Sequence, residues 1–373
     1  MDCFFAAVEA RDNPEYRGVP LIVGGPRGTP RAVVSTCSYE ARKFGVHSAM
    51  PISQAERLCP QGVFIEGRMS RYAQVSREIM ETLQGFTPVM QQVSIDEAYL
   101  DMTGCEHFYR DCEHMGDSIR EAVRRTSGLA ASVGIGPSKY ISKLASSRAK
   151  PDGLLIVAPE EVDAFLLPMP VSSLWGVGQS GRQSLERYGI CTVADLRAWP
   201  REWLIQRFGK WGATIFELSR GIDNEPVVSD EEMKSMGSES TFDSDINDRA
   251  ALCKSLAHHT SKVGSRLRQA GQLARTVTVK VKFADFQQIT RSRSLPEPFD
   301  DDDTIYSVAC SIIADTDLAQ PVRLIGLSVS GFSTGRQLSL FEFTDSSVDH
   351  VLDEIARKHG ARIAVRGRDL DNG

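Results

Sequence analysis

Hydrophobic and polar residues follow two different periods along this chain, and the changes of period mark its predicted elements. The strictest alternation runs over residues 276–283, with Val277, Val279, Val281 and Phe283 on one side and Thr276, Thr278, Lys280 and Lys282 on the other. Residues 69–84 and 249–268 instead repeat their apolar positions at the helical spacing. The chain therefore mixes half-buried strands with amphipathic helices.

The first part of the chain, to about residue 160, alternates short elements of both kinds. The pattern predicts strands at 20–24, 31–36, 89–93, 98–102 and 130–135, and helices at 39–44, 53–58, 69–84, from beyond residue 102 to about 125, and 138–148. The interpretation is an α+β sheet domain with helices on one face.

The second part begins with a helical stretch, residues 171–218, which has short glycine-bearing turns. An acidic segment without periodicity, 221–237, reads as a linker. Strands near 240 and at 276–283, 289–295 and 322–330 then combine with helices at 249–268 and 304–314 in the order β-α-β-β-α-β. A tail with a predicted helix at 348–359 ends the chain.

Composition places the chain in an ordinary class. It has 373 residues, of which 41% are hydrophobic and 25% charged, and its longest apolar runs are far too short to span a membrane. The N-terminus has no basic region ahead of an apolar core, so we expect a cytoplasmic protein. The eight cysteines show no paired spacing, which favours reduced thiols over a disulfide framework.

One cysteine pattern is a candidate metal site. Cys105 and His107 are repeated seven residues later by Cys112 and His114, and a helix would bring each pair onto one stripe. This is not a known zinc spacing, so we favour a helix that repeats itself.

Net charge argues against a nucleic-acid partner, but the distribution of charge reverses that argument. The chain has a formal net charge of -6. The segment from Lys254 to Ser294, however, contains nine lysines and arginines and only one acidic residue, Asp285. A basic face of this kind can follow a phosphate backbone, although a solvated surface is the simpler interpretation.

Asp96 and Glu97 are the strongest catalytic candidates. They are adjacent between two apolar runs, and both can reach one metal cluster only where the backbone turns, as at a hairpin tip. Carboxylates in that arrangement can hold the two divalent ions of a phosphoryl-transfer site. The alternative is an ordinary surface pair.

Further residues could bind phosphate. Tyr39 and Arg42 lie three apart on a predicted helix face that could grip a triphosphate, and the basic helix that begins at 138 and leads to Lys150 adds positive charge. Gly176 and Gly178 could let backbone N–H groups approach a nucleic-acid phosphate. Solvated helix faces and an ordinary helix-helix turn are the alternatives.

These motifs together resemble the Y-family of translesion DNA polymerases. The resemblance covers residues 1–9, 35–51, 93–101, 134–151, 174–196 and 236–242, nearly the whole chain in the right order. It implies an α+β multidomain fold with a ferredoxin-like palm and small fingers (1–160), a helical thumb with a helix-hairpin-helix (161–222), a linker (223–237), a β-α-β-β-α-β little finger (238–333) and a tail (334–373).

The resemblance also implies roles for single residues. Asp96 and Glu97 would be ligands of two Mg²⁺ ions, with Glu97 nearest the primer 3′-hydroxyl and the Met1 carbonyl beside the nucleotide-side ion. Phe5 would be the steric gate that excludes a ribose 2′-hydroxyl. Tyr39, Arg42 and Lys150 would bind the triphosphate. The residues implied to contact DNA are Gly176, Gly178, Lys280, Lys282, Arg291 and Arg293.

The expected partners follow from the same resemblance. They are primer-template DNA, deoxynucleoside triphosphates (dNTPs) and the bacterial sliding clamp (its beta subunit), with no membrane association, and we expect a monomer. In the tail, Gln337, Leu338, Leu340 and Phe341 form a pentapeptide pattern that resembles a clamp-docking peptide, with a polar anchor followed by apolar residues for a pocket.

The N-terminus departs from the family pattern. In the family the first palm strand ends in an Asp one residue before the position of Met1, and that carboxylate bridges both metals. We expect either that translation starts upstream, so that the protein carries this strand, or that the chain is a truncated, catalytically impaired adaptor that binds DNA and clamp. The other intact site residues favour the first. Asp2 could substitute in part, because it lies two residues along the same strand. A nucleotidyl cyclase is a further alternative, but it would need neither the clamp peptide nor the basic little finger.

Overall fold

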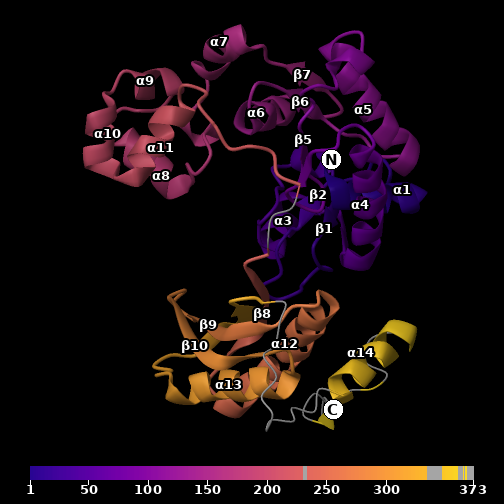
Figure 1. The fold of residues 1–373 in the computed structure, drawn as a ribbon, viewed down its shortest axis with the longest axis vertical. Coiled ribbons are helices and arrows are strands. Elements are labelled where there is room, and N and C mark those ends of the chain that lie inside the picture. The colour runs from indigo at the N-terminus through magenta and orange to yellow at the C-terminus, as the bar shows by residue number, and fades with distance from the viewer. Residues whose placement is uncertain (230–232, 334–346, 360–363, 365, 368–373) are drawn as a thin grey trace. The chain divides into compact units, whose positions relative to one another are not determined.

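The computed structural model describes residues 1–229, 233–333, 347–359, 364, 366 and 367 (Figure 1). The chain folds as two compact units, Met1–Glu231 and Glu232–Gly373. Among the described residues, no helix combines the length and the apolar character that a membrane span requires.

The first unit opens with a small three-stranded sheet. Its order is β2 (Thr36–Cys37), β1 (Leu21–Val23) and β3 (Val63–Ile65). The nearby helices are α1 (Phe4–Asp12), α2 (Tyr39–Arg42), α3 (Ile52–Leu58) and α4 (Met69–Gln84). The prediction of a strand over 31–36 was wrong, because residue 36 alone of this range belongs to a strand, β2. Val34 instead exchanges backbone hydrogen bonds with residues 49 and 50, which folds this segment onto the loop before α3.

Two pairs of strands complete the sheet structure of this unit. The strands β4 (Met90–Gln92) and β5 (Ala98–Leu100) form the predicted antiparallel hairpin, and β6 (Val133–Ile135) pairs in parallel with β7 (Leu154–Ile156). Helices α5 (Cys112–Ser127) and α6 (Lys139–Ala149) accompany them. Buried side chains of α1, α4 and α5, such as Val8, Ile79 and Val123, form one core.

The cysteine-histidine repeat does not lie on one helix. A single 3₁₀ turn covers Glu106–Phe108, and α5 begins only after Asp111, whose carboxylate accepts the backbone N–H of His114 at 2.7 Å. This cap ends the helical register between the two halves, so the prediction of a continuous helix was wrong. Within the described ranges, no group of three or more His, Cys, Asp or Glu side chains could hold a metal ion.

The rest of the first unit is helical, as predicted for 171–218. After α7 (Val162–Leu166) come α8 (Gln179–Glu186), α9 (Val193–Arg197), α10 (Arg201–Phe208) and α11 (Lys210–Leu218). Leu185, Leu196 and Ile215 are fully buried between these helices. A capping box of Thr192 and Asp195 starts α9.

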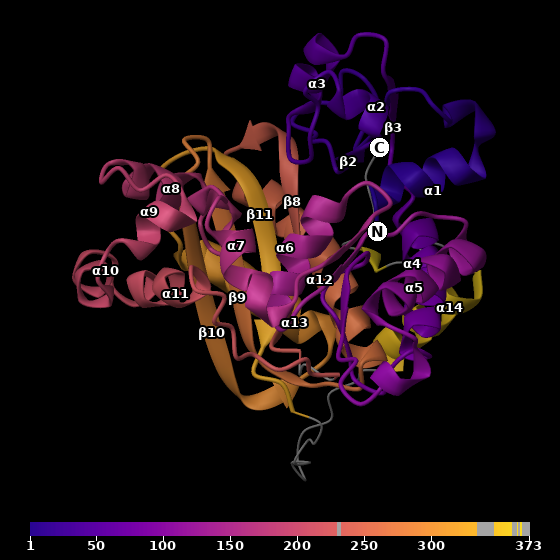
Figure 2. The same cartoon turned by 90° about the horizontal axis from the view of Figure 1, so that it is seen from above.

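The second unit is a four-stranded antiparallel sheet in the order β10-β9-β11-β8. The strands are β8 (Ser235–Ile246), β9 (Ala274–Phe283), β10 (Gln288–Phe299) and β11 (Val322–Ser330). Helices α12 (Arg249–Gln269) and α13 (Asp302–Asp315) cover one face of this sheet, and α14 (Ser347–His359) follows (Figures 1 and 2). The predicted β-α-β-β-α-β order is confirmed.

Candidate active site

The carboxylates Asp96 and Glu97 lie at the tip of the β4-β5 hairpin. Below them, Gln92 pairs with Ala98, and the backbone N–H of Val93 donates to the Glu97 carbonyl at 3.0 Å, which closes the turn. The Ser94 hydroxyl donates to the Asp96 carboxylate at 2.8 Å. Asp96 and Glu97 therefore lie in a turn and not in an extended strand, so their side chains need not point to opposite faces of a sheet.

Helix α6 brings two lysines to this hairpin. The Lys143 ammonium forms an ion pair with the Glu97 carboxylate, and the Lys139 ammonium donates to the Gln91 side chain at 3.2 Å. These two lysines are four residues apart and so share one face of α6. The sequence predicted a phosphate-binding role for this helix, whereas in the structure these ammonium groups contact the hairpin.

Met1 is the point at which the predicted site residues meet. Its amino group donates to the Asp96 carbonyl at 2.7 Å, and the Lys150 ammonium lies 3.4 Å from the Met1 carbonyl oxygen. Burial lowers the pKa of the Met1 amino group, while the carboxylates of Asp96 and Asp2 act in the opposite direction. The structure thus brings the Met1 backbone into contact with the Asp96 backbone carbonyl and the Lys150 ammonium, close enough to the hairpin carboxylates for their charges to act on the Met1 amino group.

Tyr39 and Arg42 lie together on α2. The guanidinium carbon of Arg42 is 4.9 Å from the centre of the Tyr39 ring, and Ser38 caps the helix by accepting the N–H of Ala41. Burial raises the pKa of the Tyr39 hydroxyl to about 12. That hydroxyl is buried and has no hydrogen-bond partner among the described residues, which leaves it able to bind a ligand.

Phe5 projects from α1 onto a second aromatic ring. Its ring stacks on Tyr72 of α4, and the Tyr72 hydroxyl donates to the buried Glu9 carboxylate at 2.6 Å. Arg68 in turn donates to Glu9 at 2.8 Å. Tyr72 was missed by sequence reasoning, because its place on the apolar stripe of an amphipathic helix is typical of a core residue.

The glycine turn lies between a 3₁₀ turn (Val171–Ser173) and α8. Gly176 has a φ of 75°, which glycine adopts without strain, and the Trp211 indole donates to its carbonyl at 3.2 Å. A Cβ added to Gly178, the N-cap of α8, would meet nothing within 4 Å. The backbone is therefore open to an approaching phosphate.

The four cationic residues predicted to contact DNA do not share one face of the second sheet. Lys280 and Lys282 point away from the helices, and Lys280 reaches across Gly326 to the Glu239 carboxylate at 2.8 Å. Arg291 pairs with Val279 and Arg293 with Val277, so both lie on the helix-covered side. Arg293 donates there to Asp315 of α13 at 2.8 Å.

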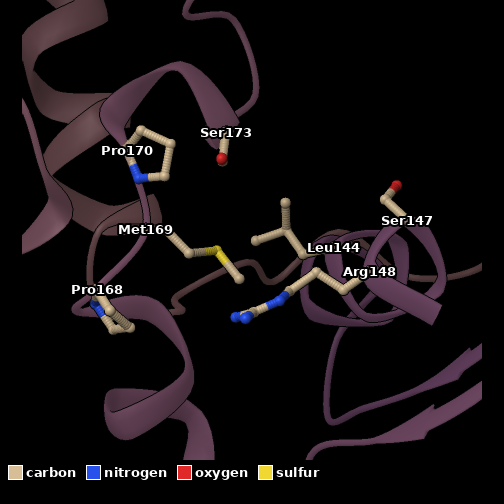
Figure 3. Close-up of a pocket in the computed structure, with 7 residues that line it drawn as sticks. All are labelled: Leu144, Ser147, Arg148, Pro168, Met169, Pro170 and Ser173. Carbon is tan, nitrogen blue, oxygen red and sulfur yellow. The ribbon is translucent and has the colours of Figure 1, made fainter. Parts of the chain in front are cut away.

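A cavity of about 520 Å³ lies between α6 and the segment before α8 (Figure 3). The side chains of Leu144, Arg148 and Met169 converge on it. None of the residues that line it belongs to the hairpin or to α2. Of the residues that line the cavity, those on α6 are the ones whose element also contributes side chains to the candidate site.

Comparison with known proteins identifies the fold. The model of the impB/mucB/samB family matches residues 1–147, that of the C-terminal domain of this family matches 233–340, and that of a DNA polymerase-iota thumb domain matches 172–223. A curated relative from Alkalilimnicola ehrlichii, named DNA polymerase IV, is 42% identical over 348 residues, covering 91% of this chain and 97% of its own.

A second curated relative and a solved structure point to the same family. A DNA polymerase IV from Listeria monocytogenes is 42% identical over 331 residues, covering 88% of this chain and 93% of its own. A solved Y-family DNA polymerase chimera superposes with a TM-score of 0.82 at 26% identity, covering 90% of this chain and 98% of its own.

Fold and comparisons together define a DNA-directed DNA polymerase. The chain belongs to the impB/mucB/samB family of Y-family polymerases, and its function is translesion DNA synthesis. It binds DNA and dNTPs, and like its family it uses divalent metal ions. The comparisons do not favour the alternative of a catalytically impaired adaptor.

Proposed function

We propose that Asp96 and Glu97 are the catalytic carboxylates of this translesion polymerase. The observation that carries the proposal is their position at the hairpin tip, where the Met1 carbonyl and Lys150 also converge. The reaction is the attack of a primer 3′-hydroxyl on the α-phosphate of a dNTP, with release of pyrophosphate.

The donor set at the tip suits magnesium. Carboxylate and carbonyl oxygens are the ligands that this hard ion prefers, and Asp96, Glu97 and the Met1 carbonyl offer such oxygens. Two Mg²⁺ ions held there would activate the primer hydroxyl and neutralise charge on the phosphates. Glu97 lies nearest the primer 3′-hydroxyl in this proposal, and it gives up its contact with Lys143 when the site is loaded.

Nucleotide binding falls to residues around α1 and α2. Tyr39, Arg42 and Lys150 bind the triphosphate; the buried, unpaired Tyr39 hydroxyl supports this role. Phe5 is the residue that excludes a ribose 2′-hydroxyl in this proposal, and its stacking on Tyr72, which holds the ring in place, supports the role. Selection of deoxynucleotides then comes from exclusion.

Template and primer are held by two surfaces. The turn at Gly176 and Gly178 presents backbone N–H groups to a phosphate. Lys280 and Lys282 supply positive charge on the face of the second sheet that points away from the helices. Arg291 and Arg293 lie on the opposite, helix-covered side of the edge strand β10, so we propose that they contact DNA only at that edge.

The remaining proposals concern the domains, the location and the protein partner. We propose a palm with fingers over 1–160, a thumb over 161–222, a linker over 223–237, a little finger over 238–333 and a tail over 334–373. The linker boundary needs one correction, because residues 235–237 already belong to β8 and pair with β11. The protein acts as a cytoplasmic monomer that docks on the sliding clamp. The docking residues Gln337, Leu338, Leu340 and Phe341 lie outside the residues that the structure describes.

A lesion-bypass assay tests the function. The protein is given a primer-template with an abasic site, dNTPs and Mg²⁺. We expect extension past the lesion that stops when the metal is chelated. Tight binding of primer-template without any incorporation would contradict the proposal. Purified clamp provides a second arm, in which Leu340→Ala with Phe341→Ala should abolish the complex and leave extension without the clamp unchanged.

A further inference from the structure

The carboxylate of Asp2 ties together three separate segments of the first unit. Its Oδ2 atom accepts the Ser132 hydroxyl at 2.8 Å and the backbone N–H of Asp152 at 2.7 Å. Ser132 directly precedes β6, and Asp152 belongs to the loop that leads into β7. With only 3% of its surface exposed, Asp2 is a buried anchor for that loop.

The loop is also held from its outer side. Asp152 has a φ of 47°, and its carboxylate accepts Arg124 at 2.6 Å and Arg120 at 3.0 Å, both from α5. The backbone N–H of Asp152 faces Asp2 while its side chain faces α5. The position of this residue is therefore fixed from two directions.

Lys150 stands two residues before this fixed point. Its ammonium lies 4.0 Å from Asp2 Oδ1 and 3.4 Å from the Met1 carbonyl. Oδ1 itself is buried, without a hydrogen-bond partner in the described part of the chain. The two hydrogen bonds to Asp2 Oδ2 thus fix the loop that carries Lys150, whereas Oδ1 lies at 4.0 Å from its ammonium, beyond hydrogen-bond distance.

We propose that Asp2 is a positioning residue that holds Lys150 in place for the triphosphate, through the two hydrogen bonds to Oδ2. The inference rests on the proposed role of Lys150. It differs from the hypothesis that Asp2 replaces a metal-bridging carboxylate: the metal needs the negative charge, whereas the anchor needs one oxygen that accepts two hydrogen bonds.

Two variants separate these roles. In Asp2→Asn the amide oxygen can keep both hydrogen bonds, because both go to the same atom, while the charge is lost. In Asp2→Ala both bonds are lost. We expect Asp2→Ala to raise KM for the dNTP about tenfold or more, because a small displacement of a binding group is costly, with a smaller fall in kcat. Asp2→Asn should stay within about threefold of the original protein in KM, at an unchanged metal requirement.

A second mutation shows whether the effect passes through Lys150. In a Lys150→Met background, Asp2→Ala should add less than about twofold, since residues that act as one unit are not additive. Thermal unfolding of each variant reports loss of fold, and Asp2→Asn alone decides the question if Asp2→Ala does not fold. Equal losses in Asp2→Asn and Asp2→Ala with a raised metal requirement, or full additivity with Lys150→Met, would overturn the proposal.

Failure of this proposal is distinct from failure of the proposed active site. Glu97→Gln tests the hairpin carboxylates directly and does not touch the Asp2 anchor. If Glu97→Gln abolishes incorporation while Asp2→Ala leaves KM unchanged, the active site stands and the role of Asp2 falls. If Glu97→Gln retains full activity, the assignment of the hairpin is wrong, and the proposed roles of Lys150 and Asp2 fall with it.

Discussion

The rings of Phe5 and Tyr72 lie 4.4 Å apart and are nearly parallel, at an interplanar angle of 12°. They come from α1 and α4, two helices that share one buried core. Tyr72 is fully buried, so the Phe5 ring rests on a fixed surface. A residue that must reject a hydroxyl by contact needs this kind of support.

Removal of the Phe5 ring should relax sugar selection. In Phe5→Ala we expect incorporation of ribonucleotides relative to deoxynucleotides to rise by about 100-fold, because the excluded volume disappears. Single-nucleotide primer extension with matched rNTP and dNTP measures the ratio. An unchanged ratio, with dNTP incorporation intact, would show that another residue is the gate.

Loss of the Tyr72 ring, on which Phe5 stacks, should also raise ribonucleotide incorporation, but by less than loss of Phe5 itself. Tyr72→Leu removes the stacking surface and should raise the ribonucleotide ratio by less than Phe5→Ala. Tyr72→Phe keeps the ring and loses only the hydrogen bond to Glu9, so its ratio should stay near that of the original protein. Its unfolding free energy should fall by about 2 kcal/mol, the usual contribution of a hydrogen bond to a charged group. A larger change in selection for Tyr72→Phe than for Tyr72→Leu would contradict the stacking account.

If Glu97 binds metal as proposed, its ion pair with Lys143 must compete with that metal. Both side chains are partly exposed, at 31% and 37%, so their ion pair is weakened by solvent. Lys143→Met should therefore lower the Mg²⁺ concentration for half-maximal activity by only about two- to fivefold. Lys139→Met serves as a matched control on the same helix, because Lys139 contacts the Gln91 side chain and Glu225 instead. A rise in the metal requirement of Lys143→Met would refute the competition.

We expect His259 to make the stability of the second unit sensitive to acid. It is buried between Ser238 and Ser240, whose hydroxyls lie 2.9 and 3.0 Å from its two ring nitrogens. Burial lowers the pKa of His259 to about 4. Between pH 6.5 and 4 the unfolded chain binds a proton that the folded chain refuses, so stability falls as pH falls, by at most about 1.4 kcal/mol per unit.

The measurement for His259 is a difference between two proteins. Burial raises the pKa of Asp302 to about 6, and this carboxyl contributes with the opposite sign in the same range. Comparing denaturant unfolding of the original protein and of His259→Asn, each at about pH 7 and about pH 5, removes that shared contribution. The original protein should lose more stability than the variant; equal losses would mean that His259 does not contribute.

Much of the fold was predictable where one local pattern sufficed. The alternation over 276–283 identified β9 and its buried face, and the turn between two apolar runs placed Asp96 and Glu97 at a hairpin tip. Helix α1 was not predicted, because its buried residues do not form one apolar stripe that the sequence pattern could reveal. These residues are Phe4, Ala6, Val8 and Glu9.

What could not be predicted depends on contacts between distant segments. Arg293 faces α13 because of the register between β9 and β10, and a shift by one residue would reverse its side. The contacts of Lys143 with Glu97 and of Tyr72 with Phe5 likewise join separate elements. A single sequence carries no signal for such pairings. From the sequence, Lys143 could equally be a solvated charge on a helix, and Tyr72 is typical of a core residue.

The most direct test of the account is single-turnover incorporation by Asp96→Asn and Glu97→Gln. Both are near-isosteric and remove charge at the hairpin tip alone, and the Kd for primer-template is measured beside the rate. The account predicts that each variant loses at least about 1,000-fold in incorporation rate, as expected when transition-state charge is left unsupported, while the Kd changes less than about twofold. Incorporation within about tenfold of the original protein by both variants would contradict it.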